Sequence, residues 1–81
     1  MKSSNYYLKA LSTAFTNRFN NETESAKTEE LIAILHHINE ALRLNNKHHA
    51  RLFRHHCGCL LALCVYHLES EVYEALFQAL N

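Results

Sequence analysis

Histidines and cysteines crowd the second half of this 81-residue chain, and both side chains bind transition metals. Two pairs are spaced three residues apart, so that each pair would share one face of a helix: His56 with Cys59, and Cys64 with His67. A tetrahedral zinc site needs four ligands, so a pair is insufficient. The further ligands would come from an earlier segment, where the candidates are His36, His37 and Glu40.

The spacing along the chain argues against one site built from all of these residues. On a single helix, His56 and His67 would lie about 16 Å apart, because each residue adds 1.5 Å of rise. The chain also lacks the Cys-x2-Cys and His-x3-His pairs that are common at structural zinc sites. We therefore predict no cofactor and no metal as the primary interpretation. A homodimer linked by a His/Cys metal site is kept as an alternative.

Nucleophilic chemistry at cysteine is the other possibility that the residue types suggest. Cys57 follows a run of basic and histidine residues, which would lower the pKa of its thiol. Alternatively, all three cysteines pack as small apolar residues between helices. No oxyanion-binding loop is recognisable, Asp is absent, and Glu29–Glu30 suit the first turn of a helix. We therefore predict that the chain is not an enzyme.

Charge is strongly segregated although the formal net charge is zero. Residues 43–56 hold half of the eight Lys and Arg and no acid, residues 57–68 hold no charged side chain, and three Glu follow. The cations define a candidate partner-binding rim: Arg43, Lys47, Arg51 and Arg54. Such a rim suits an acidic protein partner. It would also suit a phosphate backbone, but a net charge of zero makes nucleic acid the weaker interpretation.

The elements that must position these residues are predicted to be helices, since the chain has no Pro and one Gly. Spacing places helices at about 4–19, 28–44, 47–67 and 71–80, with a loop at 20–27. Caps are expected at Ser3, Ser4 or Asn5 and at Thr28, and a new one at Ser70. Asn45–Asn46 should end the second helix in a left-handed conformation. One continuous helix through residues 47–80 is an alternative, and Gly58 would allow either a close helix approach or a relaxed turn.

Apolar stripes complete the prediction of the fold. In the first helix the stripe, which is either core or an aromatic partner-docking face, contains Tyr7, Leu11, Phe15 and Phe19. The second helix carries Leu31, Leu35, Ile38 and Leu42, and the third should be buried mainly in its second half. Residues 1–81 are thus predicted to form one all-α domain, a small antiparallel bundle of three to four helices with a possible long C-terminal helix.

The function predicted from these features is binding. The chain shows no signal-peptide-like stretch, and its uncharged run is shorter than the roughly 20 residues that span a bilayer, so we expect a cytoplasmic protein without membrane contact. We predict a small intracellular interaction module, acting as an adaptor, chaperone or inhibitor in a homo- or hetero-oligomer. An apolar helix face with the basic rim would bind the partner. The alternatives are a nucleic-acid-binding regulator using residues 47–56 and the metal-linked homodimer.

Overall fold

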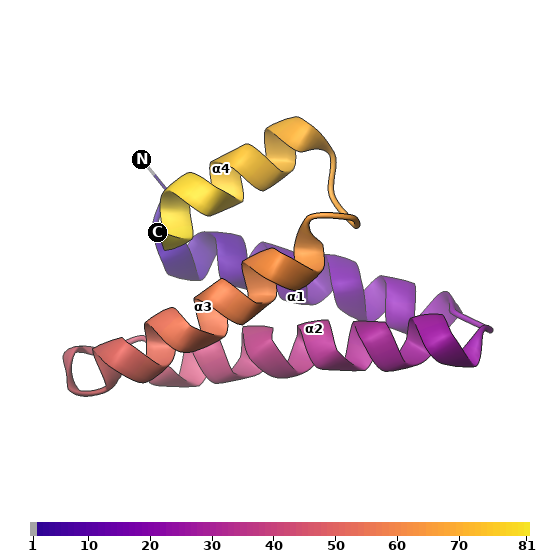
Figure 1. Ribbon diagram of the computed structural model, residues 1–81, viewed down its shortest axis with the longest axis horizontal. Helices are drawn as coiled ribbons and strands as arrows, with labels where there is room; N and C mark the ends of the chain where they lie inside the picture. The colour runs from indigo at the N-terminus through magenta and orange to yellow at the C-terminus, as the bar shows by residue number, and fades with distance from the viewer. Residues whose placement is uncertain (1) are drawn as a thin grey trace.

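The structure, a computed structural model, describes residues 2–81 and arranges them in four α-helices joined by short connections (Figure 1). The helices are α1 (Ser4–Asn21), α2 (Ser25–Leu44), α3 (Ala50–Cys64) and α4 (Ser70–Leu80), and a 3-10 turn, η1 (Lys47–His49), precedes α3. Helices α1 and α2 form a hairpin, α3 returns along α2, and α4 lies across α1 and α3 (Figure 1). The prediction of a small all-α bundle is confirmed.

The first connection is shorter than the predicted loop at 20–27. Helix α1 continues through Asn21, and α2 already begins at Ser25. The Glu22 carboxylate accepts hydrogen bonds from the backbone N–H groups of Thr23 and Glu24, at 3.1 and 3.2 Å, and so satisfies the turn locally. Thr28, predicted to be the cap of α2, instead lies within that helix, and its hydroxyl donates to the Glu24 carbonyl at 2.9 Å.

The second connection also differs from its prediction. No residue other than glycine has a positive φ in residues 2–81, so Asn45 and Asn46 do not use the left-handed conformation. Their side chains act instead: Asn46 accepts from the backbone N–H of His48 at 3.0 Å, and Asn45 donates to Ser4 Oγ and Asn5 Oδ1 at 3.0 and 2.7 Å. These bonds bring the start of α1 to the α2–α3 connection. The predicted third helix consequently begins as η1 and becomes α-helical at Ala50.

The break between α3 and α4 is present, and the continuous helix is not formed. Helix α3 ends at Cys64, and residues 65–69 turn the chain back. Ser70, the predicted cap of the last helix, is instead the first residue of α4, and its side chain makes no cap hydrogen bond. The turn is held by a contact that we call the His67 latch, made of Arg18, Glu30 and His67. Arg18 Nη1 donates to the His67 carbonyl at 2.9 Å, and His67 Nε2 lies 2.7 Å from Glu30 Oε1.

The hydrophobic core runs through the centre of the bundle. Every helix contributes to it, and its fully or nearly fully buried side chains include Leu8 and Phe15 of α1, Ile34 and Ile38 of α2, Leu60 and Cys64 of α3 and Leu76 of α4. All buried residues of α3 lie from Cys57 onward, as predicted for its second half. The hydroxyl of Tyr73 donates to the Leu61 carbonyl at 3.0 Å and ties α4 to α3. None of the helices in residues 2–81 combines the length and apolar character that a membrane crossing requires.

Gly58 lies in the interior of α3, and a Cβ atom added there would meet nothing within 4 Å. It is therefore not the point of a close helix approach. Its φ is negative, so no left-handed conformation requires glycine either. The residue lowers the stability of α3 without a compensating contact within the chain.

Gly58→Ala should therefore raise the free energy of unfolding by about 0.5–1 kcal/mol, because alanine loses less backbone entropy in a helix. Urea unfolding followed by circular dichroism measures the change. Ala10→Gly, at an exposed position inside α1, is the matched control and should lower stability by a similar amount. A destabilised Gly58→Ala variant would contradict the open environment of this position.

Candidate functional site

The predicted aromatic docking face belongs to the core. Phe15 is fully buried and Leu11 is 7% exposed, while Tyr7 and Phe19 are partly buried against the same cluster. These side chains contact the chain's own helices, so the folded monomer does not present them to a partner. The apolar surface that the structure does expose lies elsewhere, at large side chains that are 38–91% accessible: Tyr6, Ile32, Leu52, Val65, Tyr66, Val72 and Phe77.

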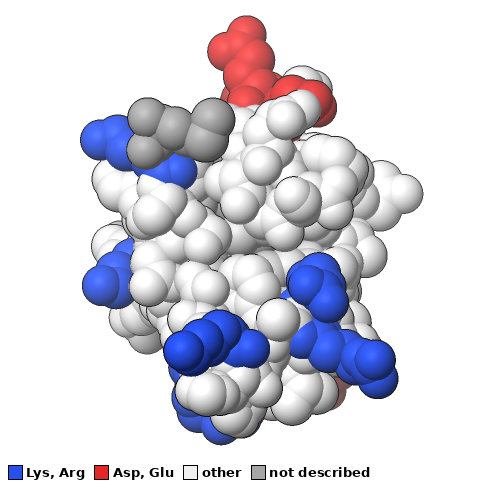
Figure 2. All heavy atoms as spheres, turned by 90° about the vertical axis from the view of Figure 1, so that its left-hand side faces the viewer, with Lys and Arg blue, Asp and Glu red and all other residues white. Residues whose placement is uncertain are grey.

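The predicted basic rim gathers at the α2–α3 connection, a region that we call the basic end. Its four cations come from three elements, since Arg43 lies in the last turn of α2, Lys47 lies in η1, and Arg51 and Arg54 lie on α3. Arg43 is paired with Glu40, at 2.6 Å from Arg43 Nη2 to Glu40 Oε2. In residues 2–81 the other three cations form no salt bridge. Figure 2 views the molecule from the side on which this end lies and shows Lys and Arg atoms over the lower part and at the left edge, with most of the acidic atoms in view at the top.

The four metal-ligand candidates in the second half do not come together. Burial raises the pKa of the Cys64 thiol to about 12, which disfavours the thiolate that binds a metal. Cys59 Sγ lies 3.8 Å from His55 Nε2, one turn earlier on α3. His67 is held in the His67 latch, and its ring packs edge-on against Phe15 with 6.0 Å between ring centroids.

His56 is the one of these four candidates that joins a cluster. Its partners are His36 and His37 on α2, which the sequence offers as supplementary ligands. One ring nitrogen from each of the three residues lies within 4.8 Å of the other two. The closest approach is 2.9 Å between the Nδ1 atoms of His37 and His56. We call these three residues the histidine cluster. His55 flanks it, with its ring centroid 5.2 Å from that of His56.

Within the histidine cluster, the surroundings of His37 favour its neutral imidazole. Burial lowers the pKa of His37, and the neighbouring rings of His36, His56 and His55 lower it further. The contact between the Nδ1 atoms requires one ring to donate and the other to accept, so it cannot persist when both rings are protonated. Glu40 lies near His36 and His56, and its pKa is lowered mainly by its hydrogen bond with Arg43.

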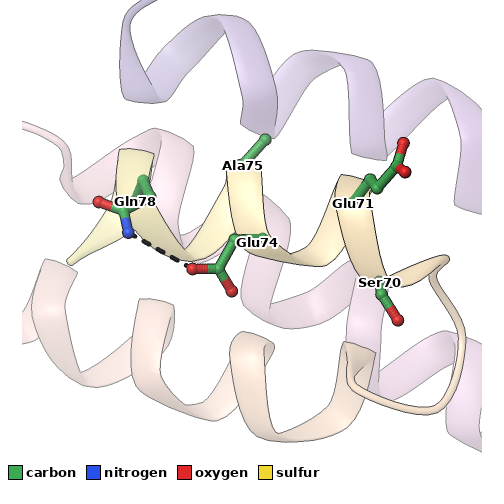
Figure 3. Close-up of a pocket in the computed structure, with 5 residues that line it drawn as sticks. All are labelled: Ser70, Glu71, Glu74, Ala75 and Gln78. Atoms are coloured by element: carbon green, nitrogen blue, oxygen red, sulfur yellow. Dashed lines mark hydrogen bonds between the residues drawn. The ribbon is translucent and has the colours of Figure 1, made fainter.

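Of the surface hollows that lie away from these groups, two have the larger volumes. One is bounded by residues of α4 alone, and Figure 3 shows them along a single helix face, with Gln78 donating to Glu74 at 3.5 Å. One helix cannot enclose a ligand. The other has a volume of about 540 Å³ beside the His67 latch and is lined by both of its ionic side chains, Arg18 and Glu30, and by Tyr66, which is 91% exposed.

No protein-family model, no curated protein sequence and no solved structure matches the chain.

The cysteines are predicted to differ sharply in reactivity. Burial raises the pKa of Cys57 to about 11 and that of Cys64 to about 12, which corrects the expectation that nearby cations activate Cys57. At pH 8 a disulfide reagent should modify the half-buried Cys59 first and the other two only as the chain unfolds. A time course of thiol release tests this, and Cys59→Ser should remove the fast phase. Rapid native modification of Cys57 would contradict the prediction.

Stability is predicted to fall in mild acid because of His37. Its folded-state pKa lies below the unfolded value of 6.5, so the unfolded chain binds the proton more readily. The free energy of unfolding should therefore decrease as the pH falls below about 6.5, by at most about 1.4 kcal/mol per pH unit for one proton. Urea unfolding between pH 5 and 7 in metal-free buffer measures this dependence, in a range above that in which Glu40 titrates.

His37→Gln should flatten that dependence. His48→Gln, at an exposed position of η1, removes an imidazole without touching the histidine cluster and should leave the dependence as in the unmodified chain. Equal slopes for the unmodified chain and His37→Gln would show that the cluster does not disfavour protonation.

Proposed function

We propose that the chain is a small, non-enzymatic interaction module that binds an acidic protein partner at its basic end. The observation that carries the proposal is the set of three cations without an acidic partner in residues 2–81: Lys47, Arg51 and Arg54. Glu40, the glutamate nearest to them along the chain, is already paired with Arg43. A partner with a complementary acidic surface would supply the missing charge and be steered toward this end.

Apolar anchors are present at the same end. Leu52 is 50% exposed beside Arg51 on α3, and Tyr6 is 50% exposed near the start of α1. Tyr6 belongs to this end because the adjacent Asn5 is bonded to Asn45 of the α2–α3 connection, and its ring lies under Lys2, 4.6 Å from Nζ to the centroid. Tyrosine and arginine are the residue types that contribute most to protein interfaces. These anchors take the role that the sequence assigned to the buried stripe of α1.

The exposed surface area is somewhat larger than that expected for a monomer of this mass, which is compatible with an interface for a partner. The chain exposes 5569 Å², whereas a monomer of its 9.4 kDa mass is expected to expose about 5,000 Å². Three free cysteines, two of them buried, suit a reducing compartment, and we propose a cytoplasmic location. Adaptor, chaperone and inhibitor roles would all use such a surface, as would assembly into a homo- or hetero-oligomer.

A kinetic comparison tests the proposal once cross-linking in the native lysate has identified a captured protein. Arg51→Glu should slow association at least several-fold in low salt, and the difference should shrink as salt is added, because charge at an interface rim acts on encounter. Lys27→Glu makes the same charge change at the far end of α2 and should leave the rate unchanged. An Arg51→Glu rate equal to that of the unmodified chain in low salt would refute the proposal.

The apolar anchors are tested by a change in the dissociation rate, with the association rate unchanged. Leu52→Ala should speed dissociation roughly ten-fold while association is unaffected, since the methyl groups lost contribute about 1–2 kcal/mol when an interface buries them.

The competing function is nucleic-acid binding by the same cations. Binding of a DNA duplex at 50 mM salt, with an affinity that falls steeply with salt and is reduced by Arg51→Glu, would favour it over a protein partner.

A further inference from the structure

We propose that His36, His37 and His56 form a binding site for one transition metal ion of the Zn²⁺ class. The site brings together adjacent residues of α2 and one residue of α3 that is 19 positions away in the chain. It goes beyond the proposed partner binding and does not rest on it, because none of the three residues belongs to the basic rim.

The distances are close to those that a metal ion requires. The three ligand nitrogens lie within 4.8 Å of one another, and the ring centroids of His36 are 5.1 and 5.9 Å from those of His37 and His56. Zn–N bonds of about 2.0–2.1 Å in a tetrahedral site place ligand nitrogens roughly 3.3 Å apart. Small side-chain rotations would close the difference. The rings are free to make them because His36 is exposed and the other two are only partly buried.

The backbone that carries the rings is fixed by the core. His37 is followed by Ile38, which is fully buried, and His56 is followed by Cys57, which is 2% exposed. His37 and His56 are therefore each attached to a helix position whose neighbour is packed in the core. A ligand set mounted on packed helices holds its geometry better than one on loops. The distance between the backbone positions that carry the ligands on α2 and α3 is therefore set before any ion binds.

The donor atoms select the class of ion. Imidazole nitrogen suits Zn²⁺, Cu²⁺ and Ni²⁺, whereas Ca²⁺ and Mg²⁺ prefer oxygen ligands. Three protein ligands leave a fourth tetrahedral position, and the exposure of His36 opens the site to water there. The Glu40 carboxylate lies near His36 and His56 and adds a negative charge that favours a cation, although it is engaged by Arg43.

Calorimetric titration of the untagged full chain with Zn²⁺ at pH 7.5, after removal of bound metal with a chelator, tests the site. We expect one ion per chain, and Co²⁺ in place of Zn²⁺ should give the visible absorption of a tetrahedral complex. His37→Gln and His56→Gln should each weaken binding at least roughly ten-fold. Glu40→Gln, which removes charge but no ligand, should weaken it only several-fold.

His48→Gln and His49→Gln are the matched controls, because both remove an exposed imidazole of η1 and should leave the affinity unchanged. Circular dichroism checks that each variant is folded. If a variant unfolds, histidine NMR of the unmodified chain replaces it: Zn²⁺ should shift the ring signals of His36, His37 and His56, and not those of His48, His49 or His67.

Three results would overturn the proposal. The first is no saturable binding of Zn²⁺ or Co²⁺, and the second is binding that His56→Gln leaves intact or that His48→Gln abolishes. The third is one ion per two chains, which would indicate a metal-linked homodimer instead. Failure of the metal site leaves the rate effect of Arg51→Glu untouched, so the two proposals fail separately.

Discussion

Burial of the apolar stripe along α2 is the interaction on which the rest of the structure depends. Ile34 and Ile38 are fully buried, and α2 packs against both α1 and α3. Burial of each such side chain contributes about 1.5–3 kcal/mol to the free energy of folding. The chain has only 81 residues and its three cysteines are free, so no disulfide adds to its stability. The few core contacts of α2 therefore carry a larger share of the folding free energy than single contacts do in a larger domain.

That packing also decides where polar chemistry is found. With the centre of the bundle filled by apolar side chains, no polar or charged residue of 2–81 is buried, and the ionisable groups collect at the edges of the helix contacts. The histidine cluster lies at one edge of the α2–α3 contact, and the His67 latch closes the turn after α3. Both are partly exposed, which gives them access to solutes while their backbone positions stay fixed by the core.

The helices and their buried faces were predictable because spacing of 3.6 residues is a local property of the chain. The second half of α3 is buried as its pattern indicated. The connections were less predictable. Glu22 replaces Thr28 in organising the first turn, and the side chain of Asn45 reaches back to α1, because hydrogen bonds between side chain and backbone compete with simple capping patterns.

The sequence by itself determined the helical class, the apolar stripes and the separation of charge along the chain. Only the tertiary structure decided that His56 meets His36 and His37 rather than Cys59, Cys64 or His67, and that Phe15 is core and not a docking surface. The physical reason is that helical periodicity fixes which residues share a face of one helix. The register and rotation between helices, which set distances across them, come from the packing of the whole core.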